Sequence, residues 1–333
     1  MKAVKQSVFK KQMLFLVLTC VFISGCIQKK EKVYRVGVLS GHEFFADITD
    51  GFKQKMTELG YVEGKNIVYD IKKVLAPIGN ENVLKKFVED KVDLIFVFPT
   101  EATIEAKKVT KGTGVPVVFG TAMIEIPDVI ESLRHPGENI TGVQYGANIM
   151  AIKRLEILHE IYPQGKRIWI PYFKGYPTAV PNLESLKPVA KSLGITIISL
   201  PVTSADEIKS YLESREKSGK IGFDAILEIV EPVAVMPDCL KIINEFADKH
   251  KLPIAGAVMT GKDYGPILTF IPDNIDMGRL AALQADKIFN GAQSGALPVI
   301  TPEGKLHINY KAAKRLGLNI NEGLLSMAVE IIR

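Results

Sequence analysis

The sequence is poor in the residues and motifs on which common catalytic sites depend. It contains three cysteines and five histidines in 333 residues, and none of them form a cluster with the spacing of a metal site. The pattern GxxxxGK followed by serine or threonine is absent, and so is GxGxxG, which argues against a nucleotide or dinucleotide site. HExxH and GxSxG are absent as well. The sequence therefore predicts no enzyme active site, no cofactor and no metal.

The apolar segment of the leader is too short to cross a bilayer. Residues 13–23 have the length of a signal-peptide core and follow a lysine-rich start. The next residues, ISGC at positions 23–26, resemble the lipobox of exported lipoproteins, in which the leader is cut before the cysteine and its thiol receives a lipid. We therefore expect a signal peptide with a lipobox over residues 1–25, lipidation of Cys26 and a polar tether over residues 26–32. A plain signal peptide with an incidental cysteine and an uncleaved anchor helix are the alternatives.

Little positive charge remains once the leader is set apart. The formal net charge is +5, and the first 25 residues contain four lysines and no acidic residue, so the remainder carries only +1. A nucleic-acid partner is therefore not expected. With Cys20 in the leader and Cys26 lipidated, Cys239 has no partner cysteine and is expected in the core.

What the sequence does contain is a regular alternation of strand and helix patterns. Short apolar runs alternate with amphipathic segments, which predicts strands at 34–39, 66–71, 93–98 and 115–119 and helices at 44–59, 82–89 and 101–108. Residues 137–145 then form a turn-prone break that contains glycine. The alternation restarts beyond it, with strands expected at 166–171, 195–200, 224–230, 253–257, 266–270 and 305–308, and helices at 149–161, 183–193, 205–217, 238–250, 275–289, 311–316 and 324–332.

Repeated βα units with short connections predict parallel, doubly wound sheets. The restart favours an α/β fold of two such lobes joined by a hinge, although one long sheet is possible. We expect an N-terminal lobe of residues 33–143 plus about 265–298, and a C-terminal lobe of residues 144–264 plus about 299–333. Two lobes of this kind leave a cleft between the carboxyl ends of their strands, where small ligands bind.

Candidate ligand-binding residues are those that follow the predicted strands. In the first lobe these are Ser40, His42, Pro99, Thr100, Thr121 and Met123. In the second lobe they are Tyr145, Tyr172, Tyr176, Glu231, Met259 and Tyr264. Thr100 is expected to cap its own helix, with or without a ligand contact, and the N–H groups that begin this helix suit a carboxylate. The aromatic rings suit a flat or cationic ligand, and Glu231 suits an ammonium group.

Six segments together resemble a known family. They are GYVEGKN (60–66), VDLIFVFPTEAT (92–103), VPVVFGTA (115–122), HPGENITGV (135–143), LEILHEIYP (155–163) and INYKAAKRLGLNI (308–320). Their order and spacing are similar to those of the ABC transporter substrate-binding proteins of the ABC_sub_bind type. These are type I periplasmic binding proteins, some of which bind tryptophan or phenylalanine. The resemblance implies a two-lobed clamshell that traps one small molecule and delivers it to a membrane permease driven by a separate ATPase.

The chain differs from this family at positions that bear on ligand recognition. Tyr172 matches the family pattern, but Tyr176 and Thr178 stand where the family has Glu and Asn, and Glu231-Pro232 replaces Asp-Asn. The expected function is a lipid-anchored, extracytoplasmic, monomeric solute-binding protein, with an aromatic or other amino acid as a candidate ligand. A ligand-sensing module on the same fold is one alternative. An exported enzyme that uses Glu231 and His42 as acid and base is another.

Overall fold

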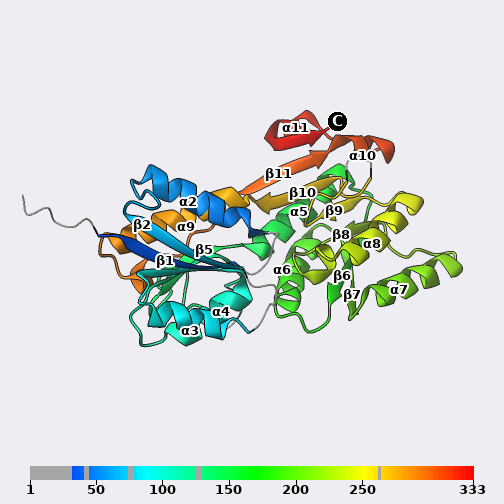
Figure 1. Cartoon of the computed structure of the whole chain (residues 1–333). Coiled ribbons are helices and arrows are strands. Elements are labelled where there is room, and N and C mark those ends of the chain that lie inside the picture. The colour runs from blue at the N-terminus through cyan, green and yellow to red at the C-terminus, as the bar shows by residue number, and fades with distance from the viewer. Residues whose placement is uncertain (1–31, 41–44, 74–78, 125, 127–128, 262–263) are drawn as a thin grey trace, which may run out of the picture.

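The computed structural model describes residues 32–40, 45–73, 79–124, 126, 129–261 and 264–333, which form two lobes (Figure 1). The expected signal peptide, the lipidation site Cys26 and the candidate ligand residue His42 lie outside the described residues. Within those ranges no helix is both long and apolar enough to pass through a membrane. Each lobe consists of one β-sheet with helices on both faces, as the alternation of patterns predicts.

The first lobe is built on a parallel sheet of five strands. These are β1 (Tyr34–Ser40), β2 (Ile67–Lys73), β3 (Leu94–Phe98), β4 (Val117–Ala122) and β5 (Ile140–Gln144), in the order β2-β1-β3-β4-β5. The central strand β3 is buried along its whole length, as its apolar sequence LIFVF requires. One face of the sheet is covered by α2 (Asp47–Glu58) and α9 (Asn274–Phe289), and the other by α3 (Glu81–Glu89) and α4 (Thr100–Thr110) (Figure 1).

The second lobe contains a sheet of seven strands. These are β6 (Arg167–Phe173), β7 (Thr196–Val202), β8 (Ala225–Leu227), β9 (Ile254–Gly256), β10 (Leu268–Pro272), β11 (Gly304–Asn309) and β12 (Ala328–Ile332). Their order is β12-β11-β10-β9-β8-β6-β7, and every neighbouring pair is parallel except β10 and β11. The helices of this lobe are α5 (Ala147–Ile161), α6 (Ala179–Ser192), α7 (Ala205–Lys217), α8 (Pro237–His250), α10 (Tyr310–Arg315) and α11 (Glu322–Met327). The two doubly wound lobes confirm the predicted fold class.

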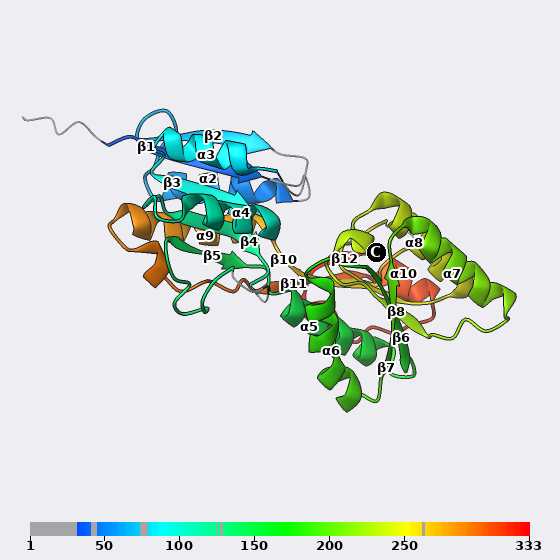
Figure 2. The ribbon, with the colours of Figure 1, turned by 90° about the horizontal axis from the view of Figure 1, so that it is seen from below.

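The described chain crosses between the lobes at three places (Figure 2). They lie between β5 and α5, between β10 and α9, and between the 3₁₀ turn η3 (Ser294–Ala296) and β11. The first and third crossings are joined by backbone hydrogen bonds, because Gln144 N–H donates to Ile300 O and Ile300 N–H donates to Gly142 O, both at 2.9 Å. Since β10 belongs to the second sheet, the chain returns to the first lobe at α9, later than the boundary near residue 265 that we expected.

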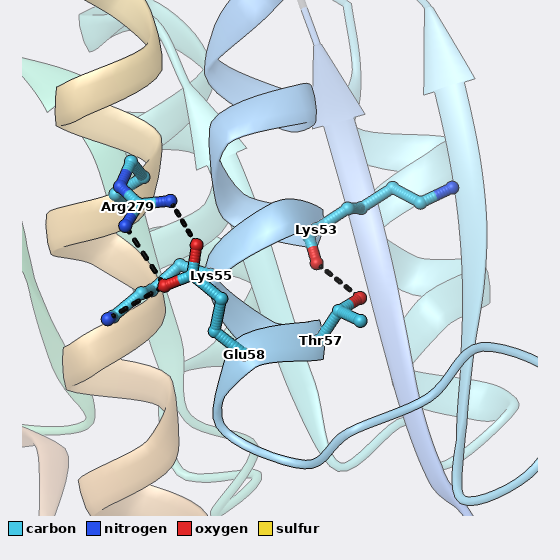
Figure 3. Close-up of polar contacts among 5 residues, drawn as sticks. All are labelled: Lys53, Lys55, Thr57, Glu58 and Arg279. Carbon is cyan, nitrogen blue, oxygen red and sulfur yellow. Dashed lines mark hydrogen bonds and ion pairs between the residues drawn. The ribbon is translucent and has the colours of Figure 1, made fainter.

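Helices α2 and α9 lie side by side although Glu58 and Asn274 are 216 positions apart along the chain. A Cβ atom on Gly278 would lie 2.0 Å from the carbonyl oxygen of Ile48, and one on Gly51 would lie 2.1 Å from that of Ile275. The two backbones therefore touch, and glycine is required at the contact. At the exposed end of the contact both Nη atoms of Arg279 donate to Glu58, at 2.7 and 3.0 Å (Figure 3). The sequence-distant α9 is thereby fixed to the first lobe.

Two segments fold differently from the sequence-based expectation. The break expected at 137–145 contains β5, in which Gly142 is required because a Cβ atom there would lie 2.2 Å from the carbonyl oxygen of Phe119 on β4. The glycine marks a close approach of two strands and not a turn. The final helix expected over 324–332 is also wrong: α11 ends at Met327, and the β-branched residues after it form β12 beside β11.

Candidate functional site

A cavity of about 450 Å³ lies between the two lobes, at the ends of their strands. This volume is in the range of small-molecule sites. Seven of the residues predicted from the sequence line it, namely Pro99, Thr100, Thr121, Met123, Tyr145, Tyr176 and Glu231. The sequence analysis did not propose seven other lining residues as ligand contacts, and these are Phe45, Glu101, Thr178, Val230, Pro232, Val235 and Met236.

Thr100 forms part of the wall that the first lobe contributes, but it does not cap its helix. Pro99 occupies the N-cap position and Thr100 is the first residue of α4. The Thr100 hydroxyl instead accepts a hydrogen bond of 2.9 Å from the backbone N–H of Met123, which follows β4. The expectation of a plain N-cap is therefore wrong, because the end of the neighbouring strand engages the hydroxyl. This bond holds two predicted site residues, Thr100 and Met123, next to each other.

A side-chain hydrogen bond joins the two lobes at the cavity. The hydroxyl of Tyr176, between β6 and α6, donates to Glu101 Oε1 on α4 at 2.9 Å. Burial raises the pKa of Tyr176 above its ordinary value, and the negative charges of Glu101 and Glu231 raise it further. Tyr176 therefore remains a hydrogen-bond donor at any physiological pH.

Glu231 is buried, with 4% of its surface exposed, and it faces the cavity from the second lobe. Its Oε2 accepts from the backbone N–H of Phe173 at 2.7 Å, and its Oε1 accepts from that of Val233 at 2.9 Å. Burial raises the pKa of Glu231 to about 7, although these backbone hydrogen bonds act in the opposite direction. The carboxyl group is therefore poised between its neutral and charged forms near neutral pH, and a nearby cation would favour the charged form.

Two further ionisable residues, Arg154 and Glu228, are buried in the second lobe. Arg154 on α5 is fully buried and donates to the backbone oxygens of Phe270 (3.0 Å) and Glu228 (3.1 Å). Burial lowers the pKa of Arg154 to about 10 and raises that of Tyr145, which lines the cavity, to about 12. Glu228 Oε2 accepts from the Ala257 N–H at 3.0 Å, and burial raises the pKa of Glu228 to about 7. Neither Arg154 nor Glu228 lines the cavity itself.

Two threonine hydroxyls on the cavity wall have no hydrogen-bond partner among the described residues. Thr121 on β4 is 2% exposed, and Thr178, at the N-cap position of α6, is 3% exposed. A buried hydroxyl without a partner costs about 1–3 kcal/mol. One of these groups belongs to each lobe, so a ligand that bonds both would hold the lobes together.

The remaining predicted residues lie elsewhere. Tyr172 packs beside α6 and lines a separate groove with Leu183 and Ile197. Ser40 ends β1 but does not line the cavity, and neither does Met259 or Tyr264, which is 50% exposed. His42 lies outside the described residues.

For some of the lining residues that were not predicted, the sequence contained an indication of their role. Glu101 directly follows Thr100, and Thr178 stands at a position where the family pattern already differs. Val235 and Met236 follow the 3₁₀ turn η2 (Pro232–Ala234), whose fold the sequence did not indicate. Within the described residues no group of three His, Cys, Asp or Glu side chains is arranged to hold a metal ion. The cavity therefore offers hydroxyl groups, carboxylates and apolar surface.

Comparison with known proteins gives one family, one curated relative and solved structures of similar fold. The model of a family described as ABC transporter substrate binding protein matches residues 35–332. A tyrosine-binding protein of Clostridioides difficile strain R20291 is 25% identical over 292 residues, which are 87% of this chain and 82% of the relative.

Two solved structures illustrate the similarity in fold. One is an ABC domain from Streptococcus pneumoniae in complex with L-Trp, with a TM-score of 0.73, 23% identity, and coverage of 90% of this chain and 100% of the other. The other is the ligand-free, open form of a substrate-binding protein with adhesive properties from Clostridium difficile. It has a TM-score of 0.72, 22% identity, and coverage of 90% and 99%.

Proposed function

This chain belongs to the family of ABC transporter substrate-binding proteins, and we propose that it is the solute-capturing component of an importer. It takes up one small molecule between its lobes and delivers it to a membrane permease driven by a separate ATPase. It acts as a monomer outside the cytoplasm, held at the membrane through lipidated Cys26. It binds its ligand without chemical change.

The observation that carries this proposal is the pair of unpartnered hydroxyls on opposite walls of the cavity. Thr121 belongs to the first lobe and Thr178 to the second, and both line the same space. A ligand that accepts or donates hydrogen bonds at both sites stabilises the closed arrangement more than the open one, which is the condition for ligand-driven closure. The Tyr176–Glu101 hydrogen bond supports the closed arrangement in the same way.

The lining supports a ligand with an apolar or aromatic body and an ammonium group. Phe45, Met123 and Val230 offer apolar contact, while the ring of Tyr145 suits an aromatic or cationic group. Glu231 offers a negative charge to an ammonium group. Because the relatives include a tyrosine-binding protein, aromatic amino acids and compounds derived from them are the first candidates.

The test is a binding screen on the purified full chain, kept in mild detergent. Amino acids, amines, sugars and nucleosides are added in turn, and the melting temperature is followed as a function of ligand concentration. A ligand that binds the folded state raises it by mass action, and the bound compound should be recovered unchanged. If every solute leaves the melting temperature unaltered, or if the bound compound is converted, the proposal is wrong.

The lipid anchor has its own test. In cells, Cys26→Ala should move the protein from the membrane fraction to the soluble fraction. Cys20→Ala is the matched control, because it removes a thiol from the same leader and should leave the protein in the membrane fraction. Membrane retention of the Cys26→Ala variant would mean that another element anchors the chain.

A further inference from the structure

We propose that the cavity selects an organic ammonium ion with an apolar or aromatic body and disfavours the corresponding amino acid, because the described lining has two acidic residues and no basic residue to receive a carboxylate. This inference rests on the proposed function and narrows its ligand class from ammonium compounds in general to amines that lack a carboxylate.

The charges on the cavity wall are all negative. Glu101 comes from the first lobe and Glu231 from the second, and no described residue that lines the cavity is lysine, arginine or histidine. Both side chains line the same space, and charge interactions near protein surfaces are several times stronger than in bulk solvent. An ammonium group is attracted from both walls. A ligand carboxylate would be repelled by both, so a zwitterion loses the advantage of its ammonium group.

Two positively charged groups lie near the cavity, namely the start of helix α4 and the side chain of Arg154. The helix α4 begins at the cavity with its positive end, but Glu101 stands in its first turn and offsets that partial charge. Arg154 interacts electrostatically with Tyr145, yet it is fully buried and does not line the cavity. Its two terminal nitrogens donate to backbone oxygens of the second lobe, while its Nε atom has no hydrogen-bond partner among the described residues. Neither group places a cationic side chain in the described lining of the cavity.

The remaining lining is suited to an amine with an aromatic body. The unpartnered hydroxyls of Thr121 and Thr178 are acceptors for ammonium N–H groups, and both side chains are more than nine-tenths buried. The rings of Tyr145 and Tyr176 allow stacking and cation–π contacts. The volume of about 450 Å³ is sufficient for an arylethylamine.

The charge state of Glu231 couples ligand binding to proton release. Burial holds part of this carboxyl group in its protonated form near pH 7. An ammonium ion beside it favours the charged form, so binding of an amine releases protons to the solvent. A carboxylate ligand would act in the opposite direction and take protons up.

The test uses three matched probes that share one aromatic body, namely phenethylamine, L-phenylalanine and 3-phenylpropionate. The corresponding indole and phenol sets are tested in the same way. Isothermal titration calorimetry on the full chain at pH 7.5 should show the amine binding at least tenfold more tightly than the amino acid, and the carboxylate not binding. Titrations in buffers of different ionisation enthalpy should show proton release with the amine.

Variants test whether the carboxylates of Glu231 and Glu101 cause the preference for the amine. Glu231→Gln and Glu101→Gln should each reduce the preference for the amine over the amino acid by at least tenfold. Tyr172→Phe removes a hydroxyl in a groove outside the cavity and keeps both carboxylates, so it should leave that preference unchanged. Glu213→Gln, an exposed change on α7, is the control.

The binding results distinguish failure of this inference from failure of the proposed function. An amino acid that binds as tightly as its amine, or more tightly, overturns this inference and leaves the proposed function standing. If the amines do not bind and a solute of another class does, this inference is also overturned and the proposed function stands. If no solute binds, the proposed function itself fails. If Glu231→Gln does not fold, the preference in the unchanged chain and in Glu101→Gln still decides the question.

Discussion

The Tyr176 hydroxyl and the Glu101 carboxylate lie 2.9 Å apart across the cavity and form a hydrogen bond between the two lobes. Glu101 begins α4 in the first lobe, and Tyr176 precedes α6 in the second. Opening of the lobes must therefore break this bond. A hydrogen bond to a charged partner contributes about 1.5–3 kcal/mol, enough to influence how long a ligand stays bound.

Tyr176→Phe should weaken ligand binding about tenfold, mainly through faster dissociation, because the closed form loses one hydrogen bond to a charged group. Stopped-flow measurement of dissociation with the ligand identified in the screen checks this. Tyr172→Phe is the matched control. It removes the same hydroxyl four residues earlier, in a groove outside the cavity, and should leave dissociation unaltered. Equal effects of both changes would contradict the assignment of Tyr176 to the lobe contact.

Thr121→Val should stabilise the protein without ligand and weaken ligand binding. The change removes a buried hydroxyl that has no partner among the described residues, so the free energy of unfolding should rise by about 1 kcal/mol. The control is Thr141→Val, whose buried hydroxyl donates to Leu297 O at 2.8 Å. That change should lower the free energy of unfolding by about 1–2 kcal/mol. Urea unfolding and calorimetric titration measure the two effects, and a destabilised Thr121→Val would show that its hydroxyl has a structural partner.

Gly278→Ala should destabilise the first lobe, because its Cβ atom would lie 2.0 Å from the Ile48 carbonyl oxygen and force α2 and α9 apart. Overpacking of this kind costs typically about 1–3 kcal/mol. Gly60→Ala is the comparison: its φ of +94° disfavours alanine, but no atom lies within 4 Å of the added Cβ. Its cost should be about 1 kcal/mol. A smaller loss of unfolding free energy for Gly278→Ala than for Gly60→Ala would argue against the close helix contact.

The strand-end rule predicted much of the cavity because it depends only on the fold class. Pro99 and Glu231 follow their strands in both sequence and structure, Thr121 lies near the end of β4, and the carboxyl ends of parallel strands meet at one edge. The rule failed at Tyr172 for a physical reason. β6 runs to Phe173, two residues beyond the predicted end, so Tyr172 lies within the strand and packs toward α6. Tyr176, after the true end, reaches the cavity.

Other parts of the site could not be predicted, because they depend on contacts between distant segments. Nothing local in the sequence places Glu101 opposite Tyr176, 75 residues away. Gly142 resembles a turn residue in sequence, but it is required by the close approach of Phe119 on the neighbouring strand. The burial of Glu231 was missed for the same reason: a loop carboxylate is usually solvated, and only the packing of η2 against β6 encloses this one.

The pH dependence of stability should depend on the buried carboxyl groups. Burial raises the pKa of Glu228 from an ordinary value near 4.5 to about 7, although the charge of Arg154 partly opposes this. Between these values the folded chain keeps a proton that the unfolded chain has lost. The free energy of unfolding therefore falls as the pH rises from about 4.5 to 7, and Glu231 contributes in the same direction.

Glu228→Gln should remove the contribution of Glu228, because glutamine keeps an acceptor for the Ala257 N–H but does not titrate. A shift of one pKa unit corresponds to about 1.4 kcal/mol. Between pH 5 and pH 8 the decrease in the free energy of unfolding should therefore be smaller in the variant than in the unchanged chain, by on the order of 2 kcal/mol. Urea unfolding at both pH values measures the difference, with the exposed change Glu213→Gln as the control. If the loss between pH 5 and pH 8 is as large in Glu228→Gln as in the unchanged chain, Glu228 is already charged in the folded protein, and Arg154 stabilises that charge more strongly than burial opposes it.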